Sequence, residues 1–352
     1  MKQLRQRQAE LDMLKLCAFV CVVCLHVAAT VWGNTPTGSW QWQVSNFFRG
    51  TWGVPVFVMI SGRFLLDPQR EADSRKLLRY LLRVTVAFAF WSLFYEMYQV
   101  FVAYPSRGVT EVNWKWEAVE SMTGEYHLWY LPMLAGLYLV TPFLRKITQD
   151  RPLMRWYLVL FAVFETVACY GVRLPKIGAL IAPVFQNMHF QFAMGYTGYF
   201  VMGYYLFSAK WTKKAELWLY LAGILCLIAT PLADIAYNLS ADAERSTLFS
   251  ENLTPNVMIS AAAIYVFFCR RVSGWLRDSK VSKWASELES LGFGAYLLHM
   301  VFICLMTDCI GIEFLTDNPL FWIPVLTVGI SAVSLAGAAL LRKIPVIGKY
   351  IA

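Results

Sequence analysis

The chain has 352 residues, of which 58% are hydrophobic and only 15% are charged, and its mean hydropathy is +0.48. Soluble domains carry about 25% charged residues, so this composition excludes an ordinary soluble domain and predicts a polytopic membrane protein. A net charge of +8 would suggest nucleic acid as a partner of a soluble protein. Here the basic residues lie between hydrophobic stretches, where membrane topology explains them without nucleic acid.

Ten hydrophobic stretches approach the ~20 residues that cross the hydrocarbon core of a bilayer. They predict an all-α bundle of about ten transmembrane helices, in a single integral-membrane domain covering 1–352. An even number of crossings places both termini on one side. The predicted stretches are 11–32, 47–66, 79–103, 127–144, 153–171, 192–208, 215–237, 256–270, 290–311 and 319–341.

Basic residues are divided unequally between the two sides of this alternation. Short cytoplasmic loops are enriched in Lys and Arg, so the side with more basic residues is predicted to be cytoplasmic. That side contains the segments before the first stretch and after the last, so both termini are predicted to be cytoplasmic. The other side holds only six of the 31 basic residues: Arg49, Arg107, Lys115, Arg173, Lys176 and Arg245.

The first hydrophobic stretch contains two polar residues that are costly inside a membrane, Lys15 and His26. Eleven residues at about 100° each bring them to one helix face, roughly 16 Å apart along the axis. Asp12 lies near that face, and the three cysteines of the stretch lie on the other side. His26 is predicted beyond the midplane, toward the outside, where a base would meet an acceptor. Taken alone, Lys15 is also explained as a topology charge and His26 as an interhelical hydrogen-bonding residue.

The second stretch and the segment after it contain a possible binding site for a cytosolic donor. Ser61 and Gly62, in GVPVFVMISGR, allow close approach of the backbone. Arg79 and Arg83, in RKLLRYLLR, lie one turn apart on one helix face at the predicted inner surface. Such a pair suits the phosphates of a coenzyme A thioester, although positive-inside anchoring explains it equally well. No spacing of Cys or His indicates a zinc site or a disulfide framework.

Several separated motifs resemble, in order, those of the integral-membrane acyltransferase-3 family. LDMLK with His26 is similar to the family's opening segment, and GVPVFVMISGR and RKLLRYLLR follow it. YHLWYLPMLAGLYLVTPFLR, YTGYFVMGYYL and SLGFGAYLLHMVFI complete the series across nearly the whole chain. The most similar subgroup is that of standalone polysaccharide O-acetyltransferases.

The resemblance implies an acyltransferase, acting on groups other than amino-acyl groups, in the bacterial inner membrane. Its donor would be cytoplasmic acyl-CoA, with acetyl-CoA expected, and its acceptor a hydroxyl of an extracytoplasmic or lipid-linked glycan. No metal and no nucleic acid are expected. His26 would act as base or acyl carrier beside Asp12 and Lys15. Donor binding is assigned to Arg79, Arg83, Ser61 and Gly62, and acceptor binding to Glu125, His127, Trp129, Tyr296 and His299.

A transporter or flippase of a lipid-linked or small polar substrate is the alternative function. Lys15 and His26 would then form an intramembrane proton or substrate relay. The two functions differ in one respect that is simple to measure, because only the acyltransferase consumes acyl-CoA.

Overall fold

The computed structural model describes residues 8–70, 73–109, 111–173, 177–189, 194–240, 245–276, 280–345 and 347–352. Throughout these ranges the regular elements are helices, which confirms the all-α prediction. Lys176 and the first two residues of the predicted stretch 192–208 lie outside the described residues.

The longer helices are α1 (Ala9–Asn34), α4 (Ser74–Tyr98), α7 (Tyr130–Ile147), α8 (Arg151–Thr166), α11 (Lys213–Ser240), α14 (Lys280–Leu305) and α16 (Pro319–Leu341). The shorter ones are α2 (Trp40–Phe48), α3 (Gly53–Leu65), α5 (Tyr104–Ser106), α6 (Trp114–Thr123), α9 (Ile177–Asn187), α10 (Tyr196–Ser208), α12 (Pro255–Phe267), α13 (Ser273–Leu276), α15 (Glu313–Asp317) and α17 (Gly348–Ile351). Turns of π- or 3₁₀-helix extend several of them.

Within the described residues, eight helical segments are long and apolar enough to cross a membrane. They correspond to eight of the ten predicted stretches. Only 17 to 50% of their most apolar windows is buried inside the chain, so much of this hydrophobic surface is available to lipid. The eight segments are Ala9–Asn34, Ser74–Ser106, Trp114–Ile147, Arg151–Gly171, Lys213–Ser240, Pro255–Leu276, Lys280–Ile310 and Pro319–Leu341.

The remaining two predicted stretches form shorter helices than expected. Stretch 47–66 is interrupted at residues 49–52, between α2 and α3, and stretch 192–208 yields α10. Helices α3 and α10 have 13 residues each, about 20 Å at 1.5 Å per residue, whereas the hydrocarbon core is about 30 Å thick. That either crosses the bilayer on its own stays a prediction.

Helices α3 and α10 pack unusually closely, because glycines face the partner backbone on both. A Cβ atom at Gly62 would lie 1.8 Å from the carbonyl oxygen of Phe200, and one at Gly203 would lie 2.0 Å from that of Met59. No side chain larger than hydrogen fits at either contact. The two short helices are therefore joined backbone to backbone.

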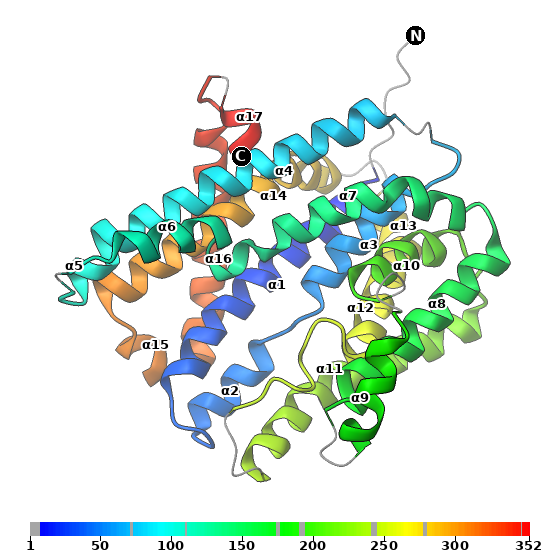
Figure 1. Ribbon diagram of the computed structural model, residues 1–352, viewed down its shortest axis with the longest axis horizontal. Coiled ribbons are helices and arrows are strands. Elements are labelled where there is room, and N and C mark those ends of the chain that lie inside the picture. The colour runs from blue at the N-terminus through cyan, green and yellow to red at the C-terminus, as the bar shows by residue number, and fades with distance from the viewer. Residues whose placement is uncertain are drawn as a thin grey trace. The chain divides into compact units, whose positions relative to one another are not determined.

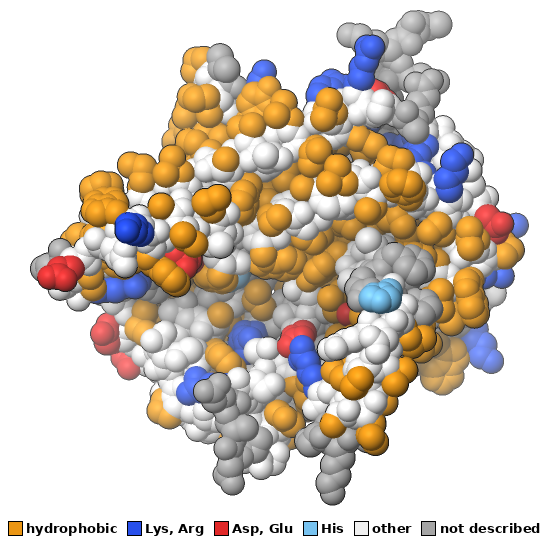
Figure 2. All heavy atoms as spheres, in the orientation of Figure 1, with side chains coloured by type: hydrophobic (Ala, Val, Ile, Leu, Met, Phe, Trp, Pro, Cys, Tyr) orange, Lys and Arg blue, Asp and Glu red, His pale blue; other side chains and the backbone are white. Residues whose placement is uncertain are grey.

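The helices group into two compact units, each assembled from separate parts of the sequence. Unit 1 contains Met1–Glu71 and Thr141–Glu289, and unit 2 contains Ala72–Val140 and Ser290–Ala352. In unit 1, α11 packs along α12, and α1 contacts both α2 and α3 (Figure 1). In unit 2, α4 contacts α6 and α17. Figure 2 shows hydrophobic side chains along the visible surface of α4. Leu78, Leu82 and Leu93 are exposed hydrophobic residues of this helix.

Polar contacts within each unit join segments that the topology prediction places on the same side. Arg145 donates to the carbonyl of Leu65 on the predicted inner side, at 2.8 Å. Arg173 forms an ion pair with Glu251 on the predicted outer side, at 2.7 Å. Further inner contacts are Arg270 and Arg271 with Glu216, and Arg151 with Ser208; further outer contacts are Arg107 with Asp308 and Arg245 with Thr37.

Candidate active site

Two polar contacts fix the start of α1 against α14 within unit 1. Lys15 Nζ forms an ion pair with Glu289 Oε1 at 2.5 Å. Three residues earlier, the carboxylate of Asp12 accepts a hydrogen bond from the Ser286 hydroxyl at 2.5 Å. Asp12 is buried, and the Lys15 and Glu289 side chains are 28% and 22% exposed. The ion pair thus lies largely out of solvent, where unpaired charges are costly.

The two contacts show that α1 and α14 run parallel where they meet. Asp12 and Lys15 are three residues apart, and so are their partners Ser286 and Glu289. Moving toward the C-terminus of one helix therefore also moves toward the C-terminus of the other. Parallel directions agree with the predicted alternation, in which the first and ninth stretches both run from inside to outside.

Glu289 and Ser286 were missed as site residues by the sequence analysis. A signal for them exists in SELESLGFGAYLLH, where Ser286 and Glu289 share a helix face by their i, i+3 spacing just before a long apolar run. A glutamate at the start of such a run needs a partner, by the same reasoning that singled out Lys15.

His26 lies three turns beyond Lys15 on the same face of α1. The residues between them on that face, Phe19 and Val22, are almost completely buried. His26 itself is half-buried, and its backbone carbonyl accepts a hydrogen bond from Thr30. Asp12, Lys15 and His26 form a polar face of α1 that we call the α1 stripe. Asp12 and Lys15 lie at one end of it, and His26 lies farther along the helix.

Ser61 and Gly62, assigned to donor binding by resemblance, have structural contacts in α3. The Ser61 hydroxyl donates to the Phe57 carbonyl one turn earlier, at 3.0 Å. Gly62 is the residue at the close contact with α10. These contacts explain why small residues stand here, and their part in donor binding stays a prediction.

Arg79 and Arg83 lie on α4 in different surroundings within unit 2. The Arg79 side chain is 73% exposed and lies 3.8 Å from Asp73. Arg83 is half-buried, with its guanidinium 4.5 Å from the centre of the Phe293 ring. Arg83 also donates to the carbonyl of Ala352 at 2.8 Å. Arg79 is therefore the more accessible of the two predicted phosphate contacts.

Unit 2 also brings together three of the predicted acceptor residues, His127, Tyr296 and His299. The Tyr296 hydroxyl donates to the His127 carbonyl at 2.6 Å, and the two imidazole rings have their centres 5.7 Å apart. Tyr95 of α4, which was not predicted, stacks edge-on against His127 with ring centres 4.7 Å apart. All four side chains are buried.

The other two predicted acceptor residues, Glu125 and Trp129, flank His127 in the sequence. Glu125 precedes the 3₁₀ turn Tyr126–Trp129 that carries His127. Trp129 is 39% exposed, unlike the buried cluster beside it. Within the described residues, no group of three or more His, Cys, Asp or Glu side chains is placed to hold a metal ion.

Comparison with known families identifies the family of the chain. A family model described as an acyltransferase domain (Acyl_transf_3) matches residues 8–341, nearly the whole chain. Neither the curated proteins nor the solved structures gave a significant match. The matched range contains every residue of the α1 stripe. It also contains the four residues of the buried cluster in unit 2, which are Tyr95, His127, Tyr296 and His299. The chain is a multi-pass membrane protein, and it belongs to the acyltransferase-3 family.

Proposed function

We propose that this protein transfers an acyl group, with acetyl as the expected one, from cytoplasmic acyl-CoA to a hydroxyl of an extracytoplasmic or lipid-linked glycan. The observation that carries the proposal is the polar stripe of α1 in a chain of this family. An intramembrane lysine is held by Glu289, a buried Asp12 is held by Ser286, and His26 lies on the same face.

His26 is the group we assign to the chemical step. Its imidazole removes the proton of the acceptor hydroxyl as that oxygen attacks the thioester carbonyl. The carbon–sulfur bond breaks, and the thiolate of coenzyme A leaves and takes up a proton. In a second route, the imidazole first accepts the acyl group and then passes it to the hydroxyl.

Lys15 of unit 1 is the group we assign to the donor, while Arg79 of unit 2 is a separate prediction from the sequence. Both are cationic, and both lie in segments predicted at the inner surface, where acyl-CoA arrives. The Glu289 carboxylate holds the Lys15 ammonium in place, so that less side-chain freedom is lost when a donor binds. The thin pantetheine arm, rather than the charged nucleotide, then extends along α1 toward His26.

The test is acyl transfer by purified His26→Ala protein with acetyl-CoA and a glycan acceptor. We expect a loss of at least about a hundredfold, because general-base catalysis contributes about 10²–10⁴-fold. Stabilisation by coenzyme A should persist in this variant, because His26 lies three turns from Lys15. His189→Ala is the matched control, since His189 is an exposed histidine in a connecting segment.

Near-normal turnover by the His26→Ala protein would refute the assignment of His26. A wild-type protein that moves substrate without consuming acyl-CoA, and that coenzyme A does not stabilise, would favour a transporter instead. A labelled acyl group trapped on the wild-type protein, and absent from the variant, would distinguish the acyl-carrier route from direct transfer.

A further inference from the structure

The four described arginines of the predicted outer side fall into two classes. Arg107 and Arg173 form ion pairs, with Asp308 at 2.8 Å and with Glu251 at 2.7 Å. For Arg49 and Arg245, no carboxylate of a described residue lies within ion-pair distance. A side with so few basic residues therefore carries two arginines whose charge is not neutralised by direct pairing.

These two arginines meet at one aromatic ring in unit 1. The guanidinium of Arg49 lies 4.4 Å from the centre of the Trp32 ring, and that of Arg245 lies 5.4 Å from it. Trp32 stands near the C-terminal end of α1, Arg49 directly follows α2, and Arg245 precedes α12. Segments far apart in the sequence thus converge on a single cationic and aromatic cluster, which we call the Trp32 cluster.

Arg245 has a structural role that leaves its charge in place. It donates hydrogen bonds to the Trp32 and Thr35 carbonyls and to the Thr37 hydroxyl. The carbonyls lie at the C-terminal end of α1, where a cation is favourable. All three acceptors are neutral, so the positive charge of Arg245 still acts on its surroundings.

Arg49 has no comparable structural role. Its side chain donates no hydrogen bond to a described residue, and its Nε atom is buried without an acceptor among those residues. The Nε1 atom of Trp32 is likewise buried, with no acceptor in the part of the chain that the structure describes. Asp234 acts on Arg49 electrostatically from beyond ion-pair distance, and its carboxylate is already engaged by the backbone N–H of Phe249. Unsatisfied donors beside an unpaired cation indicate a place for an anion.

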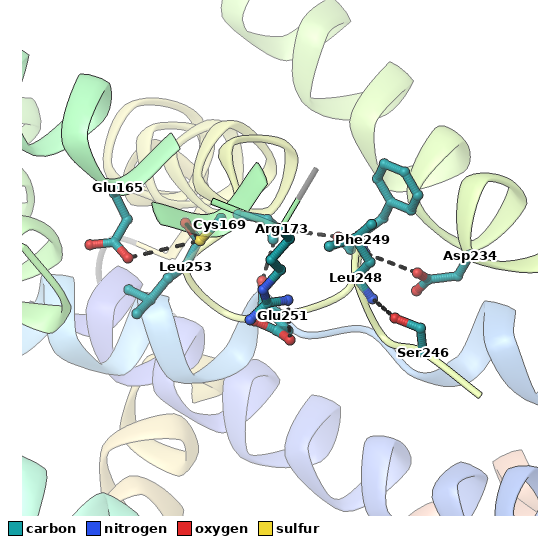
Figure 3. Close-up of polar contacts among 10 residues, drawn as sticks. Glu165, Cys169, Arg173, Asp234, Ser246, Leu248, Phe249, Glu251 and Leu253 are labelled. Atoms are coloured by element: carbon teal, nitrogen blue, oxygen red, sulfur yellow. Dashed lines mark hydrogen bonds and ion pairs between the residues drawn. The ribbon is translucent and has the colours of Figure 1, made fainter. Parts of the chain in front are cut away.

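The segment that carries Arg245 is firmly held. Asn238 exchanges two hydrogen bonds with the backbone of Ser246, at 2.7 and 2.8 Å. Figure 3 shows the rest of the segment, with Phe249 bonded to Asp234 and with Glu251 facing Arg173. The ion pair with Glu251 raises the pKa of Arg173, which therefore stays charged. Arg245 is thus presented from a fixed backbone.

We propose that the Trp32 cluster binds a phosphate group of the acceptor, on the outer side of the membrane. Arginine forks match the oxygens of phosphate, and two of them balance the two charges of a diphosphate diester. The end of a transmembrane helix beside an interfacial Trp is also the depth at which lipid phosphates lie. This inference rests on the proposed function, because it names the chemical class of the acceptor.

The position along α1 is suited to such an acceptor. Trp32 lies six residues beyond His26, about 9 Å along the axis and about a third of a turn around it. A phosphate held at Trp32 would therefore leave an attached sugar within reach of the His26 level. The phosphate-bearing molecule is either lipid-linked or water-soluble, and the experiment distinguishes the two.

The experiment measures the thermal midpoint of the purified full chain, saturated with coenzyme A so that donor phosphate contacts are occupied. Inorganic pyrophosphate, farnesyl diphosphate and farnesol are titrated separately, and the midpoint shift gives an apparent affinity. Arg49→Gln is the test variant, since it breaks no hydrogen bond to a described residue. Lys115→Gln is the control, because it removes one exposed positive charge from the same predicted side.

We expect both diphosphates to stabilise the wild-type and Lys115→Gln proteins, and to bind Arg49→Gln about tenfold or more weakly, as the loss of a charge-assisted hydrogen bond implies. Tighter binding of farnesyl diphosphate supports a lipid-linked acceptor, and equal binding supports a water-soluble one. Equal affinity of wild type and Arg49→Gln, no shift with either diphosphate, or an equal shift with farnesol would overturn the proposal.

Failure of the proposed function would appear separately in the same experiment. If coenzyme A alone does not stabilise the protein, the acyltransferase proposal is weakened. The dependence of the pyrophosphate shift on Arg49 is then measured without coenzyme A, and it still decides whether the Trp32 cluster binds phosphate.

Discussion

At the scale of single residues, Lys15 shows how a partner changes an interpretation. From sequence alone, a lysine at the inner edge of a membrane helix is explained as a topology charge. In the structure its ammonium pairs with Glu289, which is distant in the sequence and only 22% exposed. An ion pair held this far out of solvent fixes the position of the charge, which a plain topology signal does not require.

We expect Glu289→Gln to lower acyl transfer about tenfold, because the pair is intermediate between surface pairs, worth about 0–1 kcal/mol, and buried pairs, whose disruption costs about 3–5 kcal/mol. The measurement is a double-mutant cycle with Lys15→Met, read as acyl transfer and as apparent affinity for coenzyme A. Glu287→Gln, an exposed glutamate two residues away, is the control. Purely additive effects of the two substitutions would show that the pair does not position Lys15.

At the scale of elements, the two predicted crossings that are short, α3 and α10, pack against each other. Each helix is too short to cover the hydrocarbon core by itself, yet both are rich in buried residues. Glycines at the contact allow the backbones to approach, which is a common solution where helices associate inside membranes. Ser61 and Gly62 therefore fit a packing role as well as the predicted donor-binding role.

We expect Gly62→Ala to destabilise the protein by at least about 1–3 kcal/mol, the usual cost of overpacking, because the new methyl group would meet the rigid Phe200 carbonyl. Gly329→Ala in α16 is the matched control, since apart from the backbone of its own helix no atom of the described residues lies within 4 Å of its added Cβ. That change should be neutral or stabilising by up to about 1 kcal/mol. The measurement is the thermal midpoint in detergent. Similar midpoints for the two variants would contradict the close contact.

At the scale of the whole molecule, the predicted topology decides which end of the α1 stripe faces the cytoplasm and which faces the outside. Contacts inside each unit join predicted inner segments to inner ones and outer segments to outer ones. Arg145 with Leu65 and Arg173 with Glu251 are two examples. These partners are far apart in the sequence. If the prediction had missed or added one crossing between two of them, it would have placed the two partners on opposite sides of the membrane. The alternation is therefore supported by contacts that did not enter its prediction.

We expect a cysteine at Lys115 to react with a membrane-impermeant maleimide in intact cells, and one at Lys210 to react only after permeabilisation. Both lysines are exposed, so accessibility to reagent is limited by the membrane rather than by the fold. The background lacks the eight native cysteines. The opposite labelling pattern would invert the topology, and with it the assignment of His26 to the outer half of α1.

Several features were predictable from the sequence because they depend on local composition and periodicity. Long apolar runs predict helices whatever their neighbours, and the all-α membrane fold is accordingly confirmed. The face shared by Lys15 and His26 follows from the helical repeat alone. The family was likewise indicated by short motifs in order, and the domain model over residues 8–341 confirms it.

The tertiary structure alone decided which polar residues become neighbours. Glu289 lies 274 positions from Lys15, and Arg245 lies 213 positions from Trp32. No local pattern encodes such pairings, since they depend on which helices pack together and in which register. The lengths of α3 and α10 also differ from those that hydropathy predicted, since stretch 47–66 is divided between α2 and α3, and α10 begins only at Tyr196. The sequence thus determined the helices and the chemistry each one carries, while their packing determined which groups meet to form a site.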